Sequence, residues 1–247
     1  MSQSPVGNSG SLFDGQFLTS RTEALFRTDA DGDLLQTNGL DRHASPALFL
    51  TVGVKATIVR FRAGFPKDVR ERVEEHLRRK LDRSWALTGI PASLIDELRV
   101  LVSGVSRVLA ENHGPLFAFA DGVPDVPEAR LIEPGDFSLV QDLFPQATPE
   151  AVEALQPFLA MVEGGRAVST CFSARGSALV HEAGVDTMRQ FRRRQLGRRV
   201  CAAWANAVRR SRAIPVYSTS FDNHASLALA RGAGLIPLGV DLHFTVE

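Results

Sequence analysis

The sequence predicts an α+β fold, and three observations point to it. Hydrophobic residues make up 44% and charged residues 23% of the 247 residues, the usual balance of a globular chain with a buried core. Three short apolar runs in the second half are separated only by glycine-containing turns, as in an antiparallel meander; they cover 158–162, 168–174 and 178–185. Two helical segments precede these runs, and helix, strand, helix and strand follow them, an order typical of an α+β sheet.

The first half of the chain begins with a segment of low periodicity. Residues 1–20 are rich in Ser, Gly, Gln and Asn, so we expect a flexible tail. The turn sequence at 29–33 joins two short strands and is similar to a calcium loop only superficially, because its glycine is misplaced and its twelfth position is Leu40. Strands are predicted at 24–27, 34–37 and 54–62.

Two helices are predicted next. Pro66 opens the first, and its apolar side chains recur four residues apart on one face: Val69, Val73, Leu77 and Leu81. The second is expected at 93–111, before a strand at 115–120. Segment 121–128 holds two prolines, two aspartates and a glycine, and it is the predicted link between a domain at 21–126 and a domain at 127–247, each with its own sheet.

The second half has the richer pattern. Thr148 is suited to cap a helix, because its hydroxyl can accept a backbone N–H and Pro149 fits the first helical position. The long helix after the meander carries Leu196, Val200, Trp204 and Val208 on one face. Besides the meander, the predicted elements are a strand at 130–133, helices at 134–144 and from 149, the long helix at 197–210, a strand at 215–219, a helix at 223–231 and strand material at 235–246.

Charge and cysteine content exclude several functional classes. The 28 basic residues equal the 28 acidic ones, which argues against a nucleic-acid partner. Two cysteines, Cys171 and Cys201, are too few for a disulfide framework or a metal site. No apolar run reaches the length of about 18 residues that a membrane span needs, and the first residues lack the pattern of a secretory signal. We therefore expect a cytoplasmic monomer or homodimer with no metal and no membrane contact.

The most informative segment is a basic turn between the last strand of the meander and the long helix. Residues 191–199 read FRRRQLGRR and include five arginines. The first N–H groups of a helix lack internal partners, and the helix dipole adds about half a positive charge there. Such a terminus is suited to a phosphate or pyrophosphate group. A solvated basic face is the alternative interpretation.

The segment from about residue 130 onward resembles the GNAT superfamily of N-acetyltransferases. The family signature Gln/Arg-x-x-Gly-x-Gly/Ala is matched at its outer positions by Arg192 and Gly197, with Gln195 in place of the first glycine. A second family block matches from Asn223 to Gly234. Runs 171–175 and 217–223 are similar to one bacterial subgroup with an extra N-terminal region. The resemblance implies a mixed, mostly antiparallel sheet flanked by helices, with an additional N-terminal α/β unit that we expect to be a degenerate relative.

The same resemblance implies an acyl-CoA-dependent N-acyltransferase that transfers an acetyl group to a small-molecule amine by direct attack in a ternary complex. In this family the fourth and fifth strands part, and the pantetheine arm of acetyl-CoA lies in the gap. That role falls on Ala183, Gly184 and Val185, with Asp186 and Thr187 at the strand exit. The residues expected around the phosphates and the pantetheine are Arg192, Arg193, Arg194, Gln195, Leu196, Gly197, Arg198 and Asn223.

Acyl transfer to an amine also needs a base, and a proton for the leaving thiolate. Glu182 and His181 are neighbours on a predicted strand, so only one can face the cleft, and Glu182 is our candidate base. A structural salt bridge is the alternative role for Glu182. The tyrosine that the family often uses as general acid is replaced by Ala230, which leaves Tyr217, the sole tyrosine, as the candidate acid.

Two other functions remain open from the sequence. Gln195 and the missing tyrosine depart from the family pattern, which would suit a GNAT-like enzyme with another acyl donor, an acyl carrier protein or an aminoacyl-tRNA. A non-catalytic CoA-binding protein would keep the cleft and lose the chemistry.

Overall fold

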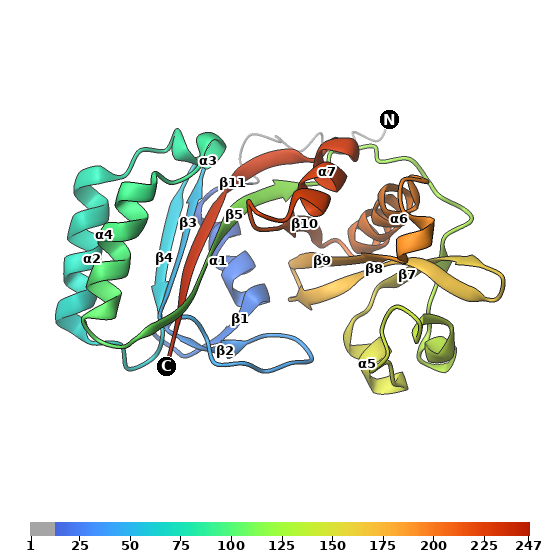
Figure 1. Ribbon diagram of the computed structural model, residues 1–247, viewed down its shortest axis with the longest axis horizontal. Coiled ribbons are helices and arrows are strands. Elements are labelled where there is room, and N and C mark those ends of the chain that lie inside the picture. The colour runs from blue at the N-terminus through green and yellow to red at the C-terminus, as the bar shows by residue number, and fades with distance from the viewer. Residues whose placement is uncertain (1–12) are drawn as a thin grey trace, which may run out of the picture.

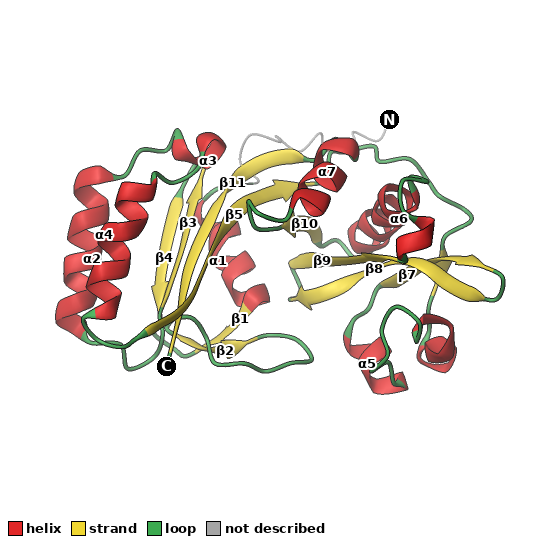
Figure 2. Ribbon diagram, in the orientation of Figure 1, coloured by secondary structure: helices red, strands yellow, loops and turns green. Residues whose placement is uncertain are grey.

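A computed structural model describes residues 13–247 and confirms the predicted α+β class with a mostly antiparallel sheet (Figure 2). The strands are β1 Phe26–Thr28, β2 Leu34–Thr37, β3 Leu48–Gly53, β4 Thr57–Phe61, β5 Val108–Ala118, β6 Arg130–Leu131, β7 Phe158–Glu163, β8 Arg166–Gly176, β9 Val180–Thr187, β10 Ile214–Ser218 and β11 Ile236–Val246. The helices are α1 Gly15–Leu25, α2 Lys67–Lys80, α3 Trp85–Thr88, α4 Ala92–Ser103, α5 Pro149–Ala154, α6 Leu196–Arg210 and α7 His224–Gly232, with 3₁₀ turns at Pro134–Val140 and Arg189–Phe191.

Nine of the strands in the described residues form one sheet in the order β4-β3-β11-β5-β10-β9-β8-β7-β6. Every neighbouring pair is antiparallel except β9 and β10, which run parallel. Strands β1 and β2 form a separate hairpin across the predicted turn at 29–33. Figure 1 shows how strongly the large sheet twists: β3 and β4 run nearly upright, β5 and β11 bend from upright toward the horizontal, and β7, β8 and β9 run nearly across the view.

Helices cover both ends of this sheet. The predicted apolar stripe of α2, including Val69, Val73 and Leu77, is buried, and it packs with α4 against the end formed by β3, β4 and β11. The predicted stripe of α6 is also confirmed, because Val200, Trp204 and Val208 are buried against the meander. Helix α1 lies in the angle between the two ends, where it contacts β4, β8 and β9 (Figure 1).

The expectation of a separate sheet in each half of the chain is wrong. Strand β11, from the second half, lies between β3 and β5 of the first half, and β5 pairs in turn with β10. One buried cluster likewise combines residues of both halves, among them Leu18, Leu116 and Val216. The composition of segment 121–128 correctly indicates an irregular connection. It does not indicate which strands before the segment pair with strands after it. The domain boundary at residue 126 stays a prediction.

Several local predictions are corrected by the structure. Residues 15–25 form α1 where we expected tail and strand, because Asp14 caps the helix and Phe17 and Leu18 bury one face. The predicted tail at residues 1–12 lies outside the described part of the chain. Strand β3 escaped prediction because all six of its residues are buried, which removes the alternating pattern. Helix α4 ends at Ser103, since pairing with β11 makes residues 108–111 strand.

Candidate active site

The parallel pair β9–β10 opens into a cleft. Its pairing ends where Glu182 lies opposite Val216, although β9 continues to Thr187. Beyond Glu182, the residues of β9 pair with β8 on one side only. The backbone N–H and C=O groups on the other side are therefore open to a ligand, because an exposed strand edge is a template for further hydrogen bonds.

A cavity of about 530 Å³ lies at this opening, between β9, β10, the first turn of α6 and α7. Eleven of the residues expected around the cofactor or the chemistry line it: Val185, Asp186, Thr187, Arg192, Arg193, Gln195, Leu196, Gly197, Arg198, Tyr217 and Asn223. The structure thus brings together two segments that the sequence separates, the basic turn and the start of α7.

The basic turn has a backbone shape suited to an anion. Arg193 and Gln195 both adopt the left-handed region, with φ of 63° and 61°. Alternation of left-handed and ordinary residues turns successive N–H groups toward one point, a concave arrangement that binds anions. Gln195 is also the N-cap residue of α6, and its side chain makes no capping hydrogen bond. The signature that this segment resembles has a glycine at the position of Gln195. Glycine suits this position for two reasons: it adopts a positive φ easily, and it lets a phosphate group come close to the backbone.

Four of the five arginines of the turn fall into two groups. Arg192, Arg193 and Arg198 line the cavity. Arg194 instead pairs with Glu163, with 2.8 Å between Nη2 and Oε1, and its guanidinium lies 5.2 Å from the ring centre of Phe191. Three of the arginines are thus placed around the cavity, while Arg194 has an exposed carboxylate partner on the meander.

Ala183 and Gly184 belong to the open part of β9 but do not line the cavity with side chains. Ala183 is buried against α6 in the core of that half. Gly184 lies under the ring of Phe172, and a Cβ atom there would come within 2.5 Å of Cε2 of that ring. Glycine is needed at this point so that the ring can cover the strand backbone.

Asn223 has a clear local role at the start of α7. Its Oδ1 accepts the backbone N–H of Ser226 at 3.1 Å, which makes it the N-cap of the helix. Because it also lines the cavity, the same residue fixes the direction of α7 and borders the cleft.

Glu182 lies at the point where β9 and β10 part, and its carboxylate is paired. Arg21 of α1 donates from Nε to Glu182 Oε2 at 3.3 Å and from Nη1 and Nη2 to Asp241 at 2.9 and 2.6 Å. Burial opposes the charge of Arg21, but the two carboxylates raise the pKa of its guanidinium above the ordinary value. Oε1 of Glu182 is buried and has no hydrogen-bond partner in the described residues.

His181 points to the opposite face of β9, as strand alternation requires. Its Nδ1 lies 2.8 Å from the Ser173 hydroxyl, which also accepts the Trp204 indole N–H at 3.2 Å. Burial lowers the pKa of His181, so the ring is neutral near pH 7. This network belongs to the core beneath α6.

Tyr217 is the one candidate for proton transfer that lines the cavity. It lies on β10 next to the opening and is only 5% exposed. Burial raises its pKa to about 12. The phenol therefore carries its proton throughout the neutral range and can act as a donor.

Sequence reasoning missed Arg21 and Asp241. They lie 161 and 59 residues from Glu182, in a helix and a strand whose neighbourhood appears only in the fold, and neither is part of a motif. Within residues 13–247, no group of three or more His, Cys, Asp or Glu side chains is arranged to hold a metal ion, and no helix is long and apolar enough to cross a membrane.

Comparisons with known proteins agree with this geometry in one segment. Residues 159–236 match the family model described as GNAT acetyltransferase. Similar solved structures include a GNAT-family protein from Novosphingobium aromaticivorans (17% identity, 57% of this chain and 68% of the other, TM-score 0.47) and a Drosophila protein (18%, 82% and 75%, 0.48). A tandem GNAT protein from the clavulanic acid biosynthesis pathway is also similar (14%, 92% and 87%, 0.41). A search of curated proteins finds no match.

Proposed function

We propose that the protein, whose residues 159–236 match the family model described as GNAT acetyltransferase, transfers an acetyl group from acetyl-CoA to a small-molecule amine. The observation that carries the proposal is the cavity where β9 leaves β10, because it combines an open strand edge with a cationic helix start. The acyl group would pass directly from the donor to the amine in a ternary complex.

The residues around the cavity fit the parts of acetyl-CoA, which supplies the thioester when bound. The open edge of β9 at 183–185 would pair with the two amides of the pantetheine arm, and Asp186 and Thr187 lie at the strand exit. The backbone of residues 193–198 would hold the pyrophosphate through its N–H groups, because two left-handed residues turn them toward one point. Arg192, Arg193 and Arg198 would add charge-assisted hydrogen bonds.

Two side chains would handle protons. Glu182 would take a proton from the amine at Oε1, the atom that has no hydrogen-bond partner within residues 13–247, while Arg21 holds Oε2. The neutral amine nitrogen would bond to the acyl carbon as it gives this proton to Glu182, and the carbon–sulfur bond would break; an amine that arrives as its cation would first lose its extra proton to water. Tyr217 would give its proton to the departing sulfur, and its pKa of about 12 supports the role of donor rather than base.

A pair of neighbouring arginines provides the experiment for the cofactor site. Arg198 lines the cavity, whereas Arg199 is paired with Glu128 outside it. We expect Arg198→Gln to weaken acetyl-CoA binding about 10-fold in calorimetric titration, the worth of one charge-assisted bond, and Arg199→Gln to leave it within about 2-fold. Absence of acetyl-CoA binding by the native protein at low salt would contradict the proposal and favour another acyl donor.

A non-catalytic CoA-binding protein is the second candidate. The observation in its favour is the buried pairing of Glu182 with Arg21, which is also what a purely structural carboxylate would show. Thiol release across an amine panel separates the two functions. Binding of acetyl-CoA without release on any amine would assign the second.

A further inference from the structure

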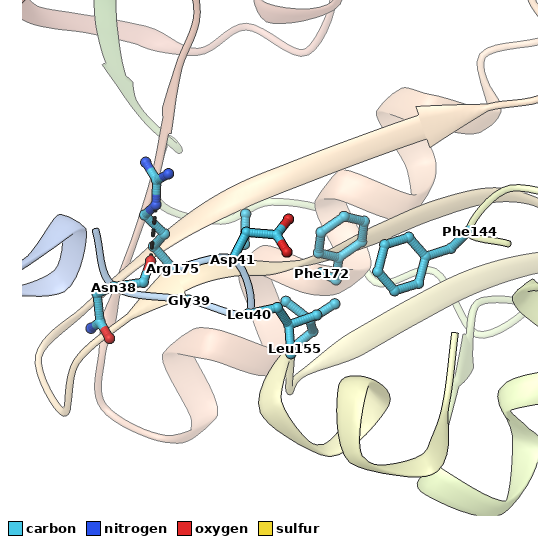
Figure 3. A pocket seen from close by; sticks show the side chains of 9 residues that line it. Asn38, Gly39, Leu40, Asp41, Phe144, Leu155, Phe172 and Arg175 are labelled. Atoms are coloured by element: carbon cyan, nitrogen blue, oxygen red, sulfur yellow. Dashed lines mark hydrogen bonds between the residues drawn. The ribbon is translucent and has the colours of Figure 1, made fainter. Parts of the chain in front are cut away.

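A second cavity, of about 160 Å³, lies on the face of β8 and β9 opposite α6. Figure 3 shows its walls: the loop at 38–41 from the first half of the chain, Phe172 and Arg175 of β8, and Phe144 and Leu155 from the segment before the meander. It shares no residue with the cofactor cavity.

The loop that forms one wall is fixed to the sheet. Asn38 donates from Nδ2 to the carbonyl of Gly176 at 3.0 Å, and Arg175 donates from Nε to the carbonyl of Asn38 at 2.9 Å. Gly39 has a φ of 132° and lies so close to the Ala174 carbonyl that a Cβ would be 3.0 Å from it. These contacts give the cavity a defined shape before any ligand arrives.

Two kinds of group meet in this cavity. The rings of Phe144 and Phe172 lie 6.1 Å apart between centres, and Leu40 and Leu155 add aliphatic surface beside them (Figure 3). The carboxylate of Asp41 points toward the Phe172 ring, and among the described residues it has no ion-pair partner. Arg175 does not neutralise it, because its guanidinium is directed away from the two rings.

The cavity also reaches the strand at which the chemistry is proposed. The ring of Phe172 is both a wall of the cavity and the cover over Gly184, in the open part of β9. Glu182 lies two residues before Gly184 on the same face, opposite Arg175 in the strand register. A ligand on Phe172 is therefore next to the backbone that borders the cofactor cleft, and it approaches from the face of Glu182.

We infer that this cavity binds the acceptor, and that the acceptor is an amine carried on an aromatic or compact apolar body. The inference rests on the proposed function. The rings and leucines would hold the apolar body, and Asp41 would attract the cationic amine to the mouth of the site. The volume suits one ring, since an apolar protein cavity of about 150 Å³ holds one benzene.

Phenethylamine is the probe for this inference, with ethylamine as an amine that lacks the ring. We expect the native protein to acetylate phenethylamine with the lower KM. Asp41→Asn should raise the KM for phenethylamine about 10-fold, with kcat and acetyl-CoA affinity within about 2-fold. Asp31→Asn is the matched control, because Asp31 is an exposed aspartate in the turn between β1 and β2. The KM of this variant for phenethylamine should equal that of the native protein.

The outcomes separate the cavity from the wider function. An unchanged KM in Asp41→Asn, or an equal KM for ethylamine and phenethylamine, would overturn the cavity assignment while acetyl transfer itself stands. Acetyl-CoA binding with transfer only to amines without a ring would overturn it in the same way. No acetyl-CoA binding at all would overturn the proposed function, and with it this inference.

Discussion

Arginines occur in two contrasting settings on either side of β9. Arg21 is 1% exposed and satisfied by two carboxylates, Glu182 and Asp241. The cavity-lining Arg192, Arg193 and Arg198 belong to a turn at the start of a helix. A buried charge is stable only when opposite charges and hydrogen bonds surround it. An accessible charge is hydrated and can exchange its water for a ligand. The first setting fixes positions, and the second provides charge for binding.

The largest effect should come from breaking the buried setting. Arg21→Met leaves the buried Glu182 and the partly buried Asp241 without their cation, so we expect a loss of about 3–5 kcal/mol in the free energy of unfolding, measured by urea denaturation. Arg194→Met is the control, because its pair with Glu163 is exposed and should be worth at most about 1 kcal/mol. Equal losses in the two variants would remove the contrast between the settings.

The proposed base gives the next largest effect. Glu182→Gln keeps an acceptor for Arg21 but cannot take a proton, so kcat should fall about 100-fold with little change in acetyl-CoA affinity. Glu163→Gln, which removes an exposed carboxylate of the same type, should leave kcat unchanged. Unchanged turnover in Glu182→Gln would return Glu182 to a structural role.

Tyr217, which lines the cavity between β9 and β10, allows a pH test. Its pKa is raised from 10 to about 12 in the folded state, so its contribution to stability is complete below pH 10 and is lost as the pH rises through 12. Native protein should therefore lose about 2 kcal/mol more than Tyr217→Phe between pH 9 and 12. If the free energy of unfolding depends on pH in the same way for the two proteins over this range, the raised pKa of Tyr217 is contradicted. Turnover of the same variant tests the donor role.

Gln195 gives the smallest expected effect. Glycine tolerates the φ of 61° that glutamine adopts at a cost, so Gln195→Gly should stabilise the fold by at most about 1 kcal/mol and tighten acetyl-CoA binding. Arg212→Gly is a matched control, since Arg212 has a φ of 65° far from the cavity and should raise stability without changing affinity. Tighter binding in the control would show that the gain is not local.

Sequence alone predicted the parts that depend on local pattern. The stripes of α2 and α6, the meander and the basic turn follow from spacing over a few residues. Motif positions also selected residues that the fold brings to one cavity, and their roles toward a cofactor stay a prediction. Arg21, Asp241 and the loop at 38–41 could not be predicted this way. Each acquires its role from a neighbour more than 100 residues away or from a strand order that no local pattern encodes.

The position of β11 determines which fragments of the chain can fold on their own. Within residues 13–247, all strand pairing of β11 is with residues 48–53 and 108–118, so a fragment of residues 127–247 would lack both neighbours of its last strand. That fragment would present two unpaired edges of β11 and one of β10, the kind of surface that drives chains to associate. Residues 127–247 are therefore not a transferable module. Two separately produced halves would have to find each other before either could become native.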